Sequence, residues 1–83
     1  MNRAQSSPTT SLHAARCGQT VRVTALAGER ALCQRLCEMG FCENAHIQKI
    51  AHGGALICCV CGVRVALSAK LAEQIFVQEV AKN

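Results

Sequence analysis

The sequence predicts a small, mostly β domain whose short strands form a partly closed barrel. Apolar and polar residues alternate over short runs, and glycine-containing turns separate these runs. A chain of 83 residues makes one small domain with a modest core. At this length a partly closed barrel is an economical way to protect strand edges. We expect about five strands, with one helix between the first two strands and a short helical turn before the last.

The composition limits which residues can form the core, which compartment the protein occupies and which kinds of partner it binds. Hydrophobic residues make up 51% of the chain and aromatic residues only 2%, so Leu, Ile, Val, Ala and Cys must form the core. The apolar runs are far shorter than the roughly 20 residues that span a bilayer, which predicts a cytoplasmic protein with its seven cysteines as thiols. The net charge of +4 is scattered along the chain and aromatic residues are few, which argues against nucleic-acid binding.

The chain begins with a polar stretch, followed by the first strand and the helix. Residues 1–11 are rich in Ser, Thr, Asn and Gln, which predicts a disordered leader ahead of a domain at 12–80. The alternation in "TVRVTAL" predicts a strand over 20–26. From Gly28 the spacing becomes helical, with Leu32, Leu36 and Met39 on one face. Gly40 is placed to end this helix in a left-handed conformation.

The second half of the chain predicts a strand, a hairpin and a closing strand. "CENAHIQKIA" holds a turn and the second strand, in which Asn44 can take a positive φ, and "HGG" at 52–54 is a loop. Gly62 indicates a two-residue turn at 61–62 that pairs Val60 with Val63. Ser68 is a plausible N-cap for a helical turn, and "IFVQEV" is the last strand.

The hairpin register separates the three cysteines of "CCVC". It directs Cys58 into the core, Cys59 to the opposite face and Cys61 into the turn. The core-facing set predicted by this register is apolar throughout: Leu56, Cys58, Val60, Val63, Val65 and Leu67. These cysteines therefore cannot converge on one metal ion, because such a site needs three or four ligands around one point.

A second cysteine group lies on the helix and leaves three interpretations open. Cys33 and Cys37 are four residues apart and hence neighbours on a helix, and Cys42 follows the Gly40 cap. They can widen the apolar stripe of the helix, bind a transition metal ion such as iron or zinc, or serve in redox chemistry. No paired carboxylates and no nucleophile with a nearby base are found, so we expect no enzymatic activity.

The run Arg35 to Phe41, "RLCEMGF", resembles the signature of the FeoA family, small cytoplasmic partners of the FeoB ferrous iron transporter. Gly62, the "AL" of residues 66–67, and Ala72 with Ile75 and Val77 follow in the order typical of that family. The resemblance implies an SH3-like barrel for 12–80. It also implies a non-enzymatic accessory role in ferrous iron uptake, with no required cofactor and with the membrane contacted only through the transporter.

The resemblance also directs attention to charged residues that could contact this partner. Arg35 and Glu38 lie in the signature, where they are either ordinary exposed helix charges in a weak i, i+3 pair or part of a contact surface. Arg64 is predicted on the outward face beside Cys59. Two positions depart from the family pattern: Glu43-Asn44 replaces Pro-Gly, and Ser68 replaces a common Arg. An exposed strand edge also allows pairing with a second copy.

Overall fold

A computed structural model describes residues 9–80, which form a six-stranded antiparallel sheet with two short helices. In chain order the elements are β1 (Thr10–Ser11), β2 (Thr20–Leu26), α1 (Arg30–Glu38), β3 (His46–His52), β4 (Leu56–Val60), β5 (Val63–Leu67), α2 (Ala69–Ala72) and β6 (Ile75–Glu79). Within this part of the chain, no helix is long and apolar enough to cross a membrane.

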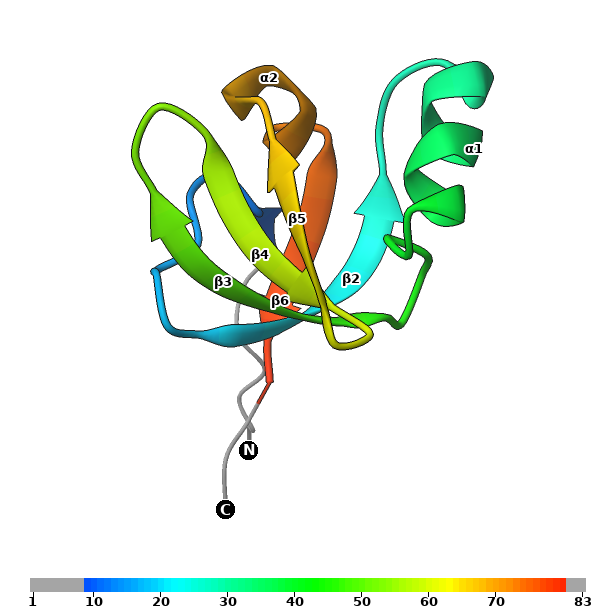
Figure 1. Cartoon of the computed structure of the whole chain (residues 1–83). Helices are drawn as coiled ribbons and strands as arrows, with labels where there is room; N and C mark the ends of the chain where they lie inside the picture. Colours follow the sequence, from blue (N-terminus) through cyan, green and yellow to red (C-terminus); the bar gives the residue numbers. More distant parts are fainter. Residues whose placement is uncertain (1–8, 81–83) are drawn as a thin grey trace, which may run out of the picture.

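The sheet is strongly curved but not closed. Its strands follow the order β1-β6-β2-β3-β4-β5, so β1 and β5 are the two edges (Figure 1). The mostly β class is confirmed, and an SH3-like barrel is consistent with this curvature. Two details of the prediction were wrong. The structure has six strands rather than about five, and α1 therefore lies between the second and third strands rather than between the first two.

The additional strand, β1, lies within the predicted leader. Thr10 pairs with Val77 and Ser11 with Phe76 of β6. Strand pairing thus begins two residues before the predicted domain start at Leu12, and residues 1–8 lie outside the described residues. The pairing uses main-chain groups, which a prediction based on side-chain composition does not register.

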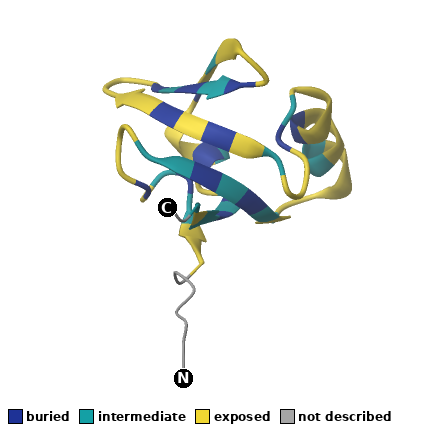
Figure 2. Cartoon of the chain, turned by 90° about the horizontal axis from the view of Figure 1, so that it is seen from below, coloured by how far each residue is buried: buried dark blue, intermediate teal, exposed yellow. Residues whose placement is uncertain are grey.

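The β4–β5 hairpin has the predicted register. Val60 pairs with Val63 across the turn, and both turn residues have positive φ, 53° at Cys61 and 79° at Gly62, as a type I′ turn requires. Buried and exposed residues alternate along the strands (Figure 2). Val63 does not reach the core, because its side chain is 61% exposed at the turn end of the hairpin. The predicted face was correct, but the burial at this position was not.

Helix α1 ends at a Schellman motif that Gly40 makes possible. The Phe41 N–H donates to the Leu36 carbonyl at 2.9 Å and the Gly40 N–H to the Cys37 carbonyl at 3.0 Å. Gly40 has a φ of 106°, and Leu36 and Phe41 are both buried in the core. The prediction that Met39 shares the buried face was wrong: Met39 is the C-cap and is 40% exposed.

The remaining turns follow their predicted residue types. Asn44 has a positive φ of 71° in the turn before β3. The Ser68 hydroxyl caps α2 by accepting a hydrogen bond from the Leu71 N–H at 3.2 Å. The loop between β3 and β4 covers only residues 53–55, because His52 pairs with Leu56 as the last residue of β3.

The core is aliphatic, apart from Phe41 and Cys58, and it encloses one lysine. Lys49 of β3 is only 2% exposed, and its Nζ donates to the main-chain carbonyls of His13 at 2.9 Å and Ala15 at 2.6 Å. These bonds satisfy much of the donor capacity of the ammonium, as a buried charge requires. Lys49 thereby ties the segment before β2 to the sheet.

Candidate functional site

The charged residues of the "RLCEMGF" segment lie on the exposed side of α1. Arg35 and Glu38 are both exposed. Their i, i+3 spacing permits an ion pair, but within residues 9–80 neither side chain forms a salt bridge or a hydrogen bond. Both charges are therefore available to a partner.

Arg64 lies near the same end of the molecule. It is exposed on β5 and pairs with Cys59, as predicted. A Cβ built on Gly40 would lie 2.6 Å from Cγ1 of Val60, so the end of α1 packs directly against the β4–β5 hairpin. We call the exposed residues around this contact the cap–hairpin surface, defined as Arg35, Glu38, Met39 and Val63. Arg35 and Glu38 therefore lie together on α1, whereas Arg64 shares the hairpin face of Cys59, opposite the face of Val60 that the end of α1 contacts.

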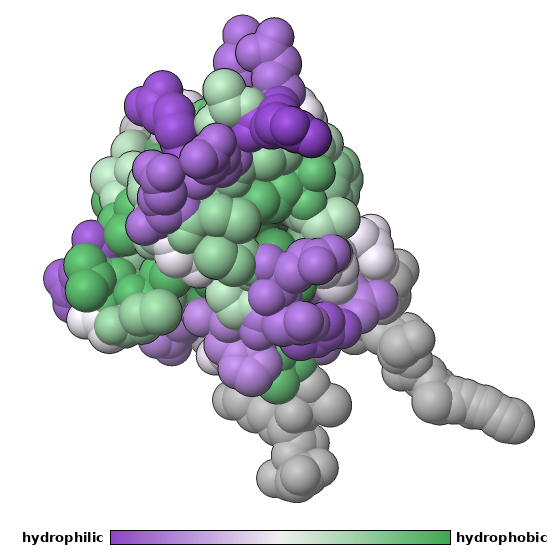
Figure 3. Space-filling model, turned by 90° about the vertical axis from the view of Figure 1, so that its right-hand side faces the viewer, coloured by the Kyte–Doolittle hydropathy of each residue, from purple (hydrophilic) through white to green (hydrophobic). Residues whose placement is uncertain are grey.

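The predicted cysteine group lines a shallow groove beside α1. Its volume is about 530 Å³, and its lining residues are Ala25, Leu26, Cys33, Cys37, Cys42 and Glu43. Apolar surface is exposed between hydrophilic groups on the side of the molecule that carries α1 (Figure 3). The helical spacing and the Schellman turn place all three thiols around one hollow, as their spacing in the sequence suggested.

The thiols of this groove are engaged with the protein itself. Cys42 Sγ lies 3.2 Å from the Cys37 carbonyl, and Cys33 Sγ lies 3.5 Å from the Ala27 carbonyl. A hydrogen bond with Cys42, and secondarily desolvation, raises the pKa of Cys37 and thus favours its neutral thiol. Among residues 9–80, no three His, Cys, Asp or Glu side chains are arranged to hold a metal ion.

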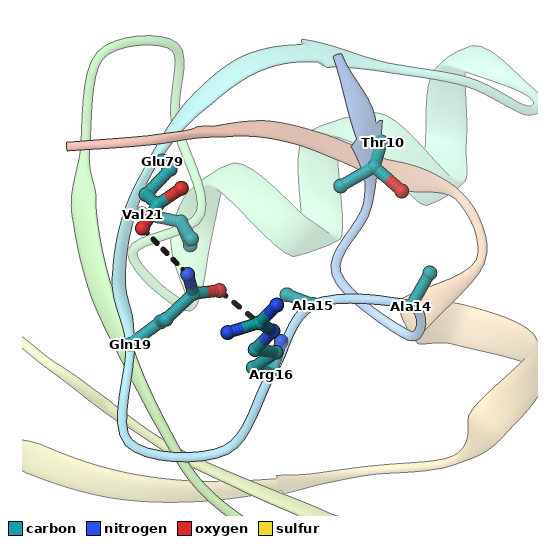
Figure 4. A pocket seen from close by; sticks show the side chains of 7 residues that line it. All are labelled: Thr10, Ala14, Ala15, Arg16, Gln19, Val21 and Glu79. Carbon is teal, nitrogen blue, oxygen red and sulfur yellow. Dashed lines mark hydrogen bonds between the residues drawn. The ribbon is translucent and has the colours of Figure 1, made fainter. Parts of the chain in front are cut away.

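A second hollow, of about 300 Å³, lies between the segment before β2 and the end of β6 (Figure 4). Gln19 links its two sides: Nε2 donates to Glu79 Oε2 at 2.7 Å, and Oε1 accepts from the Arg16 N–H at 3.2 Å. Gln19 and Glu79 are 60 residues apart in the chain, and no spacing motif connects them. Nothing in the residue pattern predicts this hollow.

The structure also joins two histidines that are isolated in sequence. The rings of His13 and His52 meet edge to face with their centroids 4.7 Å apart. Desolvation is the main cause that lowers the pKa of His52, and the charge of Lys49 and the neighbouring His13 act in the same direction. Only the fold, which brings residue 13 beside the end of β3, creates this contact.

Comparison with solved structures identifies relatives of this fold. A crystal structure of an iron uptake regulatory protein, FeoA, matches with a TM-score of 0.83 and 29% identity, covering 88% of this chain and 99% of that one. The solution structure of FeoA from Chlorobium tepidum matches with a TM-score of 0.80 and 23% identity, covering 89% and 73%. A manganese-dependent transcriptional repressor matches with a TM-score of 0.81 and 20% identity, covering 88% of this chain but only 37% of its own. The repressor contains the same fold as one part of a longer protein.

The sequence itself gives the family directly. No curated protein matches the chain significantly, but the model of the FeoA domain matches residues 10–79. This match spans all six strands, from the start of β1 to the end of β6, and includes the "RLCEMGF" segment and the cap–hairpin surface. The chain belongs to the FeoA domain family.

Proposed function

We propose that this protein is a non-enzymatic accessory protein of ferrous iron uptake that binds the cytoplasmic part of a FeoB-type transporter. Membership of the FeoA family is the observation that carries this proposal. Two relatives support the link to iron: one is described as an iron uptake regulatory protein and another, from Clostridium thermocellum, as iron(II) transport protein A. The protein acts from the cytoplasm, contacts the membrane only through its partner and binds no nucleic acid.

We assign the contact with the transporter to the cap–hairpin surface. Two of the three large hydrophobic side chains exposed in the described structure, Met39 and Val63, belong to it. Arg35 and Glu38 add charges that make no ion pair within residues 9–80. Exposed apolar side chains flanked by free charges are typical of a protein interface.

A pulldown with the cytoplasmic domain of the matching transporter tests this assignment. We expect the wild type to bind and Arg35→Glu to bind at least about tenfold more weakly, since reversing an interface charge costs more than about 1.4 kcal/mol. Arg30→Glu is the matched control, because it makes the same charge change on the same helix outside this surface. Absence of binding by the wild type overturns the proposal. An equal loss of affinity in both variants would show that binding depends on overall charge attraction and not on a local contact of Arg35.

A second candidate function is binding of a transition metal ion, iron or zinc, by Cys33, Cys37 and Cys42. Their common position around one groove favours it, although the described arrangement would have to change before three sulfurs converged. Metal analysis of protein purified under reducing conditions tests this function. Stoichiometric metal that is lost in Cys37→Ser supports the metal site, and metal-free protein rejects it.

A further inference from the structure

The two edges of the sheet differ in how they are protected against further strand pairing. Edge strand β1 has only two residues, too few to template another strand. Edge strand β5 has five residues, "VRVAL", with no proline and a regular register to β4. Within residues 9–80, β4 is the only strand that pairs with β5. β5 is therefore the side on which the sheet can be extended.

The register shows which main-chain groups of β5 are free. In a two-residue hairpin the pair that flanks the turn, Val60 and Val63, exchanges both hydrogen bonds. Alternation along the strand then directs the N–H and C=O groups of Val65 and Leu67 toward β4. Those of Arg64 and Ala66 point away from the sheet, and no loop or turn bond within residues 9–80 uses them.

These free groups are symmetric about Val65, so the strand can pair with a second copy of itself. We propose that β5 pairs with β5 of a second copy of this chain, antiparallel and with the two-fold axis at Val65. Arg64 then lies opposite Ala66 of the second copy, and Ala66 opposite Arg64 of the second copy. Each of these pairs exchanges two main-chain hydrogen bonds, so all outward groups of the two residues are satisfied.

The side chains fit this register as well as the main chain does. The two Val65 residues meet in a non-hydrogen-bonded pair, in which side chains come closest. Val63, which is 61% exposed, then lies opposite Leu67 of the second copy, so apolar residues face each other along the core side of both strands. Each Arg64 faces the small Ala66 of the other copy, which places no like charges in opposition.

Other two-fold registers with matching hydrogen-bond parity are worse. An axis at Arg64 puts the two guanidinium groups directly opposite each other, which is unfavourable. An axis at Ala66 puts Val63 opposite Ala69, where α2 begins and the strand conformation ends. Only the axis at Val65 pairs the whole of β5 with itself.

Substitution of residue 66 by a negatively or a positively charged side chain tests the proposed pairing of β5 with β5. Ala66 is exposed, so Ala66→Glu and Ala66→Lys are both compatible with folding. Ala66→Glu places a carboxylate opposite Arg64 in both halves of the dimer, and we expect the dimer dissociation constant to fall by roughly threefold to thirtyfold. Ala66→Lys opposes Arg64 with a like charge and raises the constant by a similar factor. Arg64→Glu combined with Ala66→Lys restores the attraction.

Sedimentation velocity over a wide concentration range, in a reducing buffer that prevents disulfide dimers, measures these constants. Because five residues per copy make a small interface, we expect a wild-type dissociation constant in the micromolar range or weaker. The expected result is a reversible dimer, strengthened by Ala66→Glu, weakened by Ala66→Lys and recovered in the double variant. If the wild type and the Ala66→Glu variant both stay monomeric, the proposal is overturned. The β5 edge would then be a site for pairing with a strand of another protein. A dimer that responds equally to both charges overturns the proposal too.

Discussion

The fold brings one group of three cysteines together and separates another. Cys33, Cys37 and Cys42 are separated by four and five residues, yet they line one groove. Cys58, Cys59 and Cys61 are almost adjacent in the chain, yet the strand and turn send one into the core, one to the other face and one to the surface. Helical spacing gathers residues that a strand of period two disperses. Density of cysteines in a sequence is therefore a poor guide to a shared site.

The largest expected effect comes from Gly40, where the two cysteine regions touch. Gly40→Ala forces an alanine into positive φ and drives its Cβ to 2.6 Å from Val60 of the hairpin. We expect the free energy of unfolding to fall by about 3 kcal/mol, the sum of backbone strain and overpacking. Urea denaturation measures this change.

Gly62→Ala is the matched control for Gly40→Ala. Gly62 also has a positive φ, of 79°, but a Cβ there meets no atom within 4 Å. Only the backbone strain remains, so the expected loss is about 1–2 kcal/mol. Equal losses in the two variants would contradict the close packing of the α1 end against β4.

Thiol reactivity distinguishes the buried cysteine of the hairpin from the exposed one. Burial raises the pKa of Cys58 to about 11, from an ordinary 9.0. At pH 8 it then holds about a hundredfold less thiolate than an ordinary thiol, because each pH unit changes that fraction tenfold. We expect iodoacetamide to modify exposed Cys61 at least about a hundredfold faster than Cys58, measured by mass spectrometry. Denatured protein should lose this difference, and equal native rates would place Cys58 outside the core.

Replacement of Cys58 by serine tests its role as a small apolar core residue. Cys58→Ser buries a hydroxyl where the thiol is fully enclosed, and we expect a loss of about 1–3 kcal/mol in the free energy of unfolding. Cys59→Ser, on the half-buried opposite face, should lose less than 1 kcal/mol. Thermal denaturation of both variants compares them, and a larger loss for Cys59→Ser would reverse the assigned faces.

The smallest expected effect is a gain in stability at the turn. Cys61 holds a φ of 53°, a conformation that asparagine tolerates better than cysteine does. Cys61→Asn should raise the free energy of unfolding by about 0.5 kcal/mol, because Asn-Gly is the preferred type I′ pair. Cys61→Val, with a β-branched side chain, should lower it, and denaturant midpoints of both variants check the sign.

Local chemistry was enough to predict most of the secondary structure. The alternation in 20–26, the glycine turn at 61–62 and the caps at Gly40 and Ser68 each depend on neighbouring residues only. The same local spacing brought Cys33, Cys37 and Cys42 to one side of the molecule. The FeoA resemblance of the "RLCEMGF" segment is confirmed by the family match over 10–79.

The amino-acid sequence by itself determined the β class, the hairpin register, the helix and its cap, because hydrophobic period and turn residues act over a few positions. The tertiary structure determined those features that depend on contacts between segments far apart in the chain. It paired Thr10 and Ser11 with β6, enclosed Lys49 beneath the carbonyls of His13 and Ala15, and joined His13 to His52. It also left Met39 and Val63 exposed on residue patterns that predicted burial. Burial depends on what the rest of the chain places above a side chain, and no local pattern contains that information.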